Sequence, residues 1–286
     1  MKITTSQTSR GISWTFQQSL EDLIFADDIA LLLQGYKNIQ SKTDDLVKYG
    51  RQIGLTGKMN VNKTKLMKIN TKIDKEVTAN NNRIEEGDNF IYLGNKITAN
   101  GDSTMDVENR ISKARDIFET SENPQLSDPK PKLRIFKTNV IGVLLYGSES
   151  WKVTKNISQK LDTFQTRCLH RIPKIFWPNK ITNEELYERT LRNTAAISDQ
   201  IKERQWKWIG HVMRLKPSKI PRVALRWTPP GKRNRGRPKE TWRRSVEKEM
   251  NDQVWTWGTV QTMAADRQRW RSSVQALCSQ NTKRNK

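Results

Sequence analysis

The chain has 286 residues, is 34% hydrophobic and carries a formal net charge of +22, so its core must be thin. It contains no run near the roughly 20 apolar residues that span a bilayer, and its N-terminus lacks a signal-peptide layout. Its cysteines, Cys168 and Cys278, form no Cys-x-x-Cys pair, and there are two histidines, which argues against a disulfide framework and a structural zinc site. We therefore expect a protein that is not secreted and does not enter a membrane.

Two adjacent carboxylates, Asp27 and Asp28, lie between two short apolar runs, Leu23–Phe25 and Ile29–Leu33. The pattern predicts a tight hairpin whose strands are buried in a sheet and whose turn exposes both aspartates. Paired carboxylates on rigid strands bind divalent cations, and two-metal enzymes use them to activate a 3′-hydroxyl and to stabilise a leaving pyrophosphate. An ordinary polar turn explains the same residues, because Asp is a common turn residue.

The rest of the first hundred residues alternates helical and strand patterns. Apolar residues at helical spacing from Ile39 to Ile53 predict a helix that stops at Gly54. A basic-edged strand is predicted at 59–67, a hairpin or loop at 71–88, and a strand from Phe90 that ends in a turn at Gly94. This order is typical of an antiparallel sheet with a helix packed on one face, so the predicted fold class is α+β.

From Ser103 onward the apolar period becomes helical. Ser103 and Asp106 resemble a capping box at the start of the first helix. Three apolar stripes follow, with breaks at the prolines after residue 121 and at Gly147, and they predict a small helical bundle: Val107–Phe118, Leu133–Leu144 and Ile157–Ile172. Cys168 lies on the third stripe, which predicts a core residue.

The C-terminal part is also predicted to be helical. One helix is expected at 198–215, and two further patterns lie around Trp242–Val246 and over Val260–Leu277. The Pro-, Gly- and Arg-rich segment 216–239 is predicted to be a linker or an extended arm. His211 is expected to be a hydrogen-bonded core residue rather than a ligand.

The positive charge is concentrated at the C-terminal end. Residues 200–286 contain 22 Lys and Arg against 6 Asp and Glu, and seven of the ten tryptophans. A basic segment with interleaved aromatics suits a polyanion whose bases can stack. A solvated basic face over a core built from tryptophans explains the same composition, and both interpretations can hold together.

In these motifs the chain resembles the reverse transcriptases of non-LTR (LINE-type) retrotransposons, above all the endonuclease–reverse transcriptase polyproteins of animal genomes. Phe25-Ala26-Asp27-Asp28 is similar to the catalytic box of the family's palm domain. The other matching segments follow in the family's order over nearly the whole chain: Asn62–Lys65 (the next palm motif), Tyr92–Gly94 (primer grip), Leu144–Trp151 and Trp208–Val212 (both thumb), and Gly236–Pro238 (tail).

The resemblance implies three regions: a partial palm at 1–100, a helical thumb at 101–180 and a basic, Trp-rich nucleic-acid-binding region at 181–286. Asp27 and Asp28 would be ligands of Mg²⁺. Lys63 or Lys65 would lie near the incoming triphosphate and could protonate the leaving pyrophosphate, although a surface lysine on an edge strand is equally consistent with the pattern. The implied partners are an RNA template, a DNA primer or target DNA, and a deoxynucleoside triphosphate.

The primer-grip match is Tyr92, Leu93 and Gly94, where a glycine would let the backbone approach the primer terminus closely. An ordinary strand end followed by a turn explains these three residues equally well.

The chain departs from the family before the hairpin, because a palm takes a third aspartate from an earlier strand. Here 24 residues precede Phe25, and their acids, Glu21 and Asp22, belong to the entering strand of the hairpin. Loss of one such electrostatic contact costs about 2–4 kcal/mol of transition-state stabilisation. We therefore expect a C-terminal fragment of a reverse transcriptase that is inactive alone. The alternative, from a different class, is a non-catalytic basic DNA- or RNA-binding protein.

A basic run around Arg235-Gly236-Arg237-Pro238 resembles the core of an AT-hook, in which arginines enter the narrow minor groove of A·T-rich DNA. A generic basic linker with Pro238 at the start of the next helix explains it as well. A short basic run also fits a nuclear localisation signal, so the expected location is nuclear or a cytoplasmic ribonucleoprotein. The predicted nucleic-acid-binding residues are Lys232, Arg233, Arg235, Gly236, Arg237, Lys239, Arg243 and Arg244.

Overall fold

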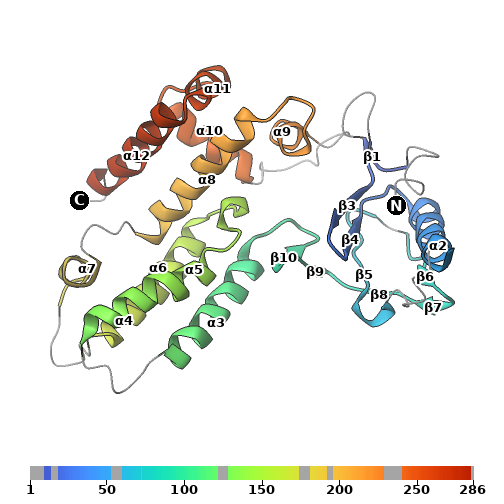
Figure 1. The fold of residues 1–286 in the computed structure, drawn as a ribbon, viewed down its shortest axis with the longest axis horizontal. Helices are drawn as coiled ribbons and strands as arrows, with labels where there is room; N and C mark the ends of the chain where they lie inside the picture. The colour runs from blue at the N-terminus through green and yellow to red at the C-terminus, as the bar shows by residue number, and fades with distance from the viewer. Residues whose placement is uncertain are drawn as a thin grey trace. The chain divides into compact units, whose positions relative to one another are not determined.

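A computed structural model of the chain describes residues 10–13, 19–52, 60–71, 73–121, 128–173, 181–191, 196–228 and 240–284 (Figure 1). The chain divides into two compact units, Met1–Asp102 and Ser103–Lys286. The described strands all lie in the first unit, together with one long helix, and the second unit is helical (Figure 1). The fold class is therefore α+β, as the sequence predicts. Among the described residues, no helix is both long enough and apolar enough to cross a bilayer.

The strands of the first unit pair two by two. Four ladders are antiparallel: β1 (Ile12–Ser13) with β2 (Ser19–Leu20), β3 (Asp22–Phe25) with β4 (Asp28–Leu31), β6 (Thr78–Ala79) with β7 (Asn82–Arg83), and β9 (Asn89–Tyr92) with β10 (Asn95–Thr98). The fifth, β5 (Lys65–Leu66) with β8 (Glu85–Glu86), is parallel. The described residues thus form separate ladders rather than the single antiparallel sheet that was predicted.

The hairpin strands are more open than predicted. Ile24 and Phe25 on β3 are 48% and 62% exposed, so the prediction that these strands are buried in a sheet was wrong. The physical reason is that neither face of a two-stranded ladder is covered unless another element packs on it.

Helix α2 (Tyr36–Gln52) confirms the predicted helix and builds the small core of the first unit. Its apolar stripe, which includes Tyr36, Ile39 and Val47, packs against three buried residues, Val77, Ala79 and Ile84. These three residues lie in and beside the β6–β7 hairpin, which confirms a hairpin within 71–88. The helix therefore packs on that hairpin.

Two-residue turns with left-handed backbone close two of the hairpins. Asn80 and Asn81 join β6 to β7 with φ of 51° and 59°, and Leu93 and Gly94 join β9 to β10 with φ of 49° and 79°. Two central residues with positive φ are the mark of a type I′ turn, which matches the twist of a hairpin. The predicted turn at Gly94 is confirmed.

The strand predicted at 59–67 is mostly a turn. Val61–Lys63 forms a 3-10 helix (η1), because the carbonyl of Asn60 accepts hydrogen bonds from the backbone N–H of Lys63 and of Thr64, both at 2.9 Å. The strand that remains is β5, Lys65–Leu66.

The first part of the helical unit confirms the three predicted stripes. Its elements are α3 (Thr104–Ser121), α4 (Pro129–Ile135), a π-helical segment η2 (Phe136–Val140), α5 (Ile141–Leu144), η3 (Ser148–Ser150), α6 (Lys155–Arg171) and α7 (Asn183–Leu191). Gly147 has a φ of 72°, where a glycine is unstrained, and it ends the second stripe as predicted. Cys168 is buried in this cluster, also as predicted.

The second part contains α8 (Ile197–Arg214), α9 (Ile220–Ala224), α10 (Trp242–Asp252), α11 (Trp257–Ala265) and α12 (Arg267–Arg284). Their core is rich in tryptophan: Trp206 and Trp270 are buried, and four more pack against them partly buried, Trp208, Trp242, Trp255 and Trp257. These six tryptophans therefore build a core, which favours the core-building interpretation for them.

Three local predictions in this part were wrong. Residues 220–224 form a helix inside the predicted linker. The single pattern over 260–277 is two helices that meet at Asp266, whose carboxylate accepts the first backbone N–H groups of α12. His211 is exposed rather than a core residue, because Ile209 and Val212 belong to the buried face of α8 and His211 lies outside that face.

The contact between α8 and α12 depends on the absence of a side chain at Gly210. A Cβ added there would meet the ring of Trp270. Gly210→Ala should destabilise the helical unit by about 1–3 kcal/mol, since neither backbone nor indole can move without loss of packing. Urea unfolding followed by tryptophan fluorescence measures this loss.

Gly142→Ala on α5 is the matched control, because nothing lies within 4 Å of a Cβ added at that position. It should be neutral or stabilising by up to about 1 kcal/mol, as expected for alanine in place of an exposed helical glycine. Equal effects of the two substitutions would contradict the close contact.

Candidate functional site

The carboxylate pair lies at the tip of the β3–β4 hairpin. Phe25 pairs with Asp28, so the turn is the two-residue segment Ala26–Asp27. Ala26 has a φ of 52°, a left-handed conformation that costs an alanine about 1–2 kcal/mol. Asp27 and Asp28 are both exposed. The predicted hairpin, with both aspartates at the turn, is confirmed.

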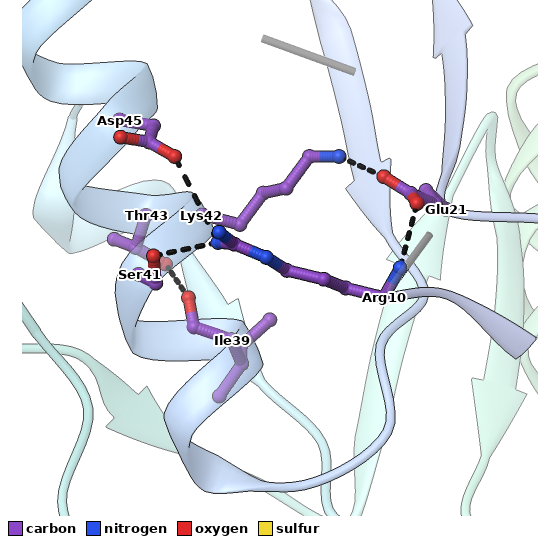
Figure 2. A network of polar contacts seen from close by, with 7 residues as sticks. All are labelled: Arg10, Glu21, Ile39, Ser41, Lys42, Thr43 and Asp45. Atoms are coloured by element: carbon purple, nitrogen blue, oxygen red, sulfur yellow. Dashed lines mark hydrogen bonds and ion pairs between the residues drawn. The ribbon is translucent and has the colours of Figure 1, made fainter. Parts of the chain in front are cut away.

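A buried ion pair joins the start of this hairpin to helix α2. Glu21, directly before β3, accepts hydrogen bonds from the ammonium of Lys42 on α2 and, at 2.8 Å, from the backbone N–H of Arg10. The side chains of Lys42 and Glu21 are 3% and 8% exposed. Figure 2 shows the Arg10 guanidinium reaching α2, where it donates to the Ser41 hydroxyl at 2.6 Å and lies 4.0 Å from Asp45.

The same contacts also lower the pKa of Glu21. Burial alone would raise the pKa of this carboxyl, but the hydrogen bonds from Lys42 and from the Arg10 backbone outweigh burial, and the pKa lies below its ordinary value of 4.5. Glu21 is therefore a structural carboxylate, and it is engaged by Lys42 rather than open to a metal.

Of the other predicted site residues in the first unit, Tyr92 contacts the carboxylate hairpin, and, among the described residues, Lys63 and Lys65 do not bond to its two aspartates. The Tyr92 hydroxyl donates to the carbonyl of Leu23 at 3.3 Å, which joins β9 to the carboxylate hairpin. Leu93 and Gly94 form the turn after β9. Lys65 instead bonds Glu85 at 3.2 Å, and Lys63 is exposed in η1. Neither lysine is bonded to Asp27 or Asp28 within the described residues.

The carboxylate pair does not by itself meet the needs of a two-metal site. The part of the chain that the structure describes contains no group of three or more His, Cys, Asp or Glu side chains that could hold a metal ion. Mg²⁺ is commonly held by one or two carboxylates, with water and substrate phosphates completing its six ligands, so the exposed pair offers only part of such a site. We therefore derive no catalytic step from Asp27 and Asp28.

In the helical unit, several carboxylates are withdrawn from the surface. Asp106 is buried and accepts a hydrogen bond from the Trp151 indole at 2.7 Å, and Glu249 accepts one from the Trp206 indole at 2.7 Å. Burial raises the pKa of Glu249, of Asp199 and of Asp162. Cations are buried in this unit as well, because Arg110 and Arg222 are 6% and 9% exposed.

A groove between α3 and α6 is lined by apolar residues and by charges of both signs. Ile111, Phe118 and Phe164 line it together with Arg115 and Arg167, and Glu108 and Glu119 also lie along it. Within the described residues neither of these two arginines forms an ion pair. Such a groove is chemically suited to a phosphate backbone with exposed bases.

The predicted basic run, Lys232 to Lys239, lies outside the described residues. Of the two arginines predicted beyond it, Arg244 is exposed. The guanidinium of Arg243 is engaged within the chain, because it pairs with Glu247 at 2.9 Å and donates to the Arg226 carbonyl at 3.1 Å.

The sequence interpretation did not single out the arginines of α12. Arg267, Arg269 and Arg271 are exposed on a helix of 18 residues that contains no acidic residue. That composition is visible in the sequence and was the signal that could have found them.

The chain is similar to a transposon-derived protein of Caenorhabditis elegans, whose own name assigns it no activity. The two are 26% identical over 269 residues, which cover 88% of this chain and 94% of the relative. A transposon origin is thus suggested for nearly the whole chain. No family model matches the chain, and no solved structure matches it.

Glu21→Gln should loosen the carboxylate hairpin, because Lys42 would remain buried without an anion. Amide hydrogen exchange in β3 and β4 should accelerate at neutral pH by an amount equivalent to about 1–3 kcal/mol. Since folding lowers the pKa of Glu21, its stabilising contribution is present above pH 4.5 and is lost as the pH falls through the lower, folded pKa. The difference between the variant and the parent chain should therefore shrink in acid.

Glu85→Gln removes an exposed carboxylate that also pairs with a lysine, and it should change exchange in β3 and β4 little. A pH-independent difference for Glu21→Gln would show that the ion pair is not its cause.

Proposed function

We propose that the chain is a nucleic-acid-binding protein that descends from the reverse transcriptase of a non-LTR retrotransposon. One observation carries the binding function: several arginines of the helical unit are exposed and form no ion pair among the described residues, namely Arg115, Arg167, Arg267, Arg269 and Arg271. Because each phosphate contact releases condensed counterions, such a surface favours polyanions of any sequence.

Two findings support the descent. The similarity to a transposon-derived protein extends over 88% of the chain. The motifs that resemble a LINE-type reverse transcriptase also occur in the family's order, and Asp27 and Asp28 lie at the tip of a hairpin, as that resemblance leads us to expect. Under this proposal the partners are RNA or DNA of the element and its target.

Binding should depend strongly on salt. For six to ten phosphate contacts, affinity for DNA or RNA should fall by about 10³–10⁵ between about 50 and 200 mM salt. Replacement of both Arg115 and Arg167 by Gln should reduce the slope of log affinity against log salt by about 1–2, since each lost phosphate contact contributes about 0.9. Fluorescence anisotropy with labelled oligonucleotides measures both quantities.

Lys65→Gln is the control, because its ammonium is already paired with Glu85 in the first unit. For Lys65→Gln, the slope of log affinity against log salt should equal that of the parent chain. An affinity that does not change with salt would exclude the proposed polyanion contact.

A second candidate function is Mg²⁺-dependent, RNA-directed DNA synthesis. The observation that favours it is the exposed aspartate pair, together with the bond from Tyr92 to the hairpin strand. In that function Asp27 and Asp28 would be Mg²⁺ ligands, and Lys63 or Lys65 would act on a deoxynucleoside triphosphate.

We expect this chain alone to extend no primer on an RNA template, because the described residues place no third carboxylate with Asp27 and Asp28, and loss of one such contact reduces a rate by a factor of about 10²–10³. The assay supplies a primed RNA template, deoxynucleoside triphosphates and Mg²⁺ and measures full-length cDNA. Robust synthesis that Asp27→Ala abolishes, and that Asp74→Ala at an exposed site preserves, would establish the polymerase instead.

A further inference from the structure

Helix α12 exposes positive charge and no negative charge of its own. Its sequence contains three arginines in the first two turns and no acidic residue. Elsewhere, exposed cations pair with acids one helical turn away on α7, α8 and α10: Arg189 with Glu185, Lys207 with Glu203, and Arg243 with Glu247. An ordinary solvated face mixes the two signs in this way, and α12 does not.

The exposed face of α12 has a defined layout. With 3.6 residues per turn, the inward stripe of Trp270, Val274 and Leu277 leaves Gln268 and Ser272 at the centre of the opposite face. Arg271 lies on one side of that centre and Arg269 on the other, while Arg267, at the start of the helix, lies closer to the inward stripe. All five of these polar side chains are exposed.

The surroundings of α12 add positive charge and leave the arginines available. Arg214, at the end of α8, has a pKa lowered first by burial and then by the nearby charge of Arg267. The carboxylate of Asp266 accepts the backbone N–H groups of Gln268 and Arg269, at 2.8 and 3.1 Å. Within the described residues, none of the three α12 arginines forms an ion pair.

The helix is held firmly on its inner side. The Trp270 indole donates to the carbonyl of Trp206 at 3.1 Å, and its ring packs 6.0 Å from that of Trp206 and 6.1 Å from that of Trp255. A helix fixed in this way presents its outer face without further ordering, which reduces the entropic cost of binding.

We infer that the exposed face of α12, over Arg267–Ser272, binds duplex DNA with the helix in the major groove. An α-helix is about 10–12 Å across with its side chains, and the major groove of B-DNA is about 12 Å wide. Arginines on both flanks reach the phosphates of both strands, and Gln268 carries the amide that pairs with adenine edges. Duplex RNA is excluded, because its major groove is deep and narrow. This inference rests on the proposed nucleic-acid-binding function and assigns it a surface and a ligand.

The test compares two double variants of the full chain that each remove two exposed positive charges. Arg267→Gln with Arg271→Gln changes the α12 face, and Lys130→Gln with Arg134→Gln changes the exposed side of α4. Each is titrated by anisotropy with a DNA duplex of about 30 base pairs and with an RNA duplex of the same sequence. Protection of guanine N7 from dimethyl sulfate reports occupancy of the major groove, and circular dichroism checks that each variant is folded.

The α12 variant should bind the DNA duplex at least about tenfold more weakly than the α4 variant, with a salt slope lower by about 1.8 than that of the parent chain. Guanine N7 should be protected by the parent chain and not by the α12 variant. DNA affinities of the two variants within a factor of about two, unprotected N7 atoms, or equal binding of duplex RNA would each overturn the α12 inference and leave the general function standing. Failure of the parent chain to bind any nucleic acid would overturn both.

Discussion

The helical unit depends on the two-sided packing of α8. Ile197 and Ile201 complete the hydrophobic cluster of α3–α7, and Trp206, Ile209 and Val212 form the centre of the tryptophan-rich cluster of α10–α12. One helix therefore serves two cores. The close approach at Gly210 lets the Trp270 ring lie against the α8 backbone, and this contact positions α12 together with the core packing of Val274 and Leu277.

The same unit gives its buried charges polar partners. Indole N–H groups of Trp151 and Trp206 bind carboxylates that lie inside or at the edge of the core, where a lone charge would be costly. The buried guanidinium of Arg222 likewise donates to Gln261 at 2.8 Å, while many other Lys and Arg side chains are exposed. A chain with a net charge of +22 repels itself, and a polyanionic partner relieves that repulsion.

The carboxylate hairpin is rigid at its base and open at its tip. The buried pair of Glu21 and Lys42 ties it to α2, and Tyr92 ties it to β9. Asp27 and Asp28 are held at the end of this scaffold without a third acidic ligand among the described residues. The tip therefore exposes two carboxylates, while the exposed cations of the helical unit supply the interaction on which the proposed function rests.

Much of the secondary structure was predictable from the sequence, because it depends on neighbours in the chain. The apolar period placed α2, α3, α6 and α8, and the alternation around Asp27 and Asp28 predicted the hairpin and the exposure of both aspartates. The strand at 59–67 was mispredicted because a local hydrogen bond to the Asn60 carbonyl outweighed its apolar residues.

The sequence by itself determined the charge balance, the helical periods, the turn chemistry and the order of the retrotransposon-like motifs. Only the tertiary structure decided that Glu21 meets Lys42, that the strands pair two by two with open faces, and that the first three arginines of α12 are exposed. The physical reason is that burial and pairing depend on which distant segments meet. A local pattern specifies the face that a residue occupies, but not what covers that face.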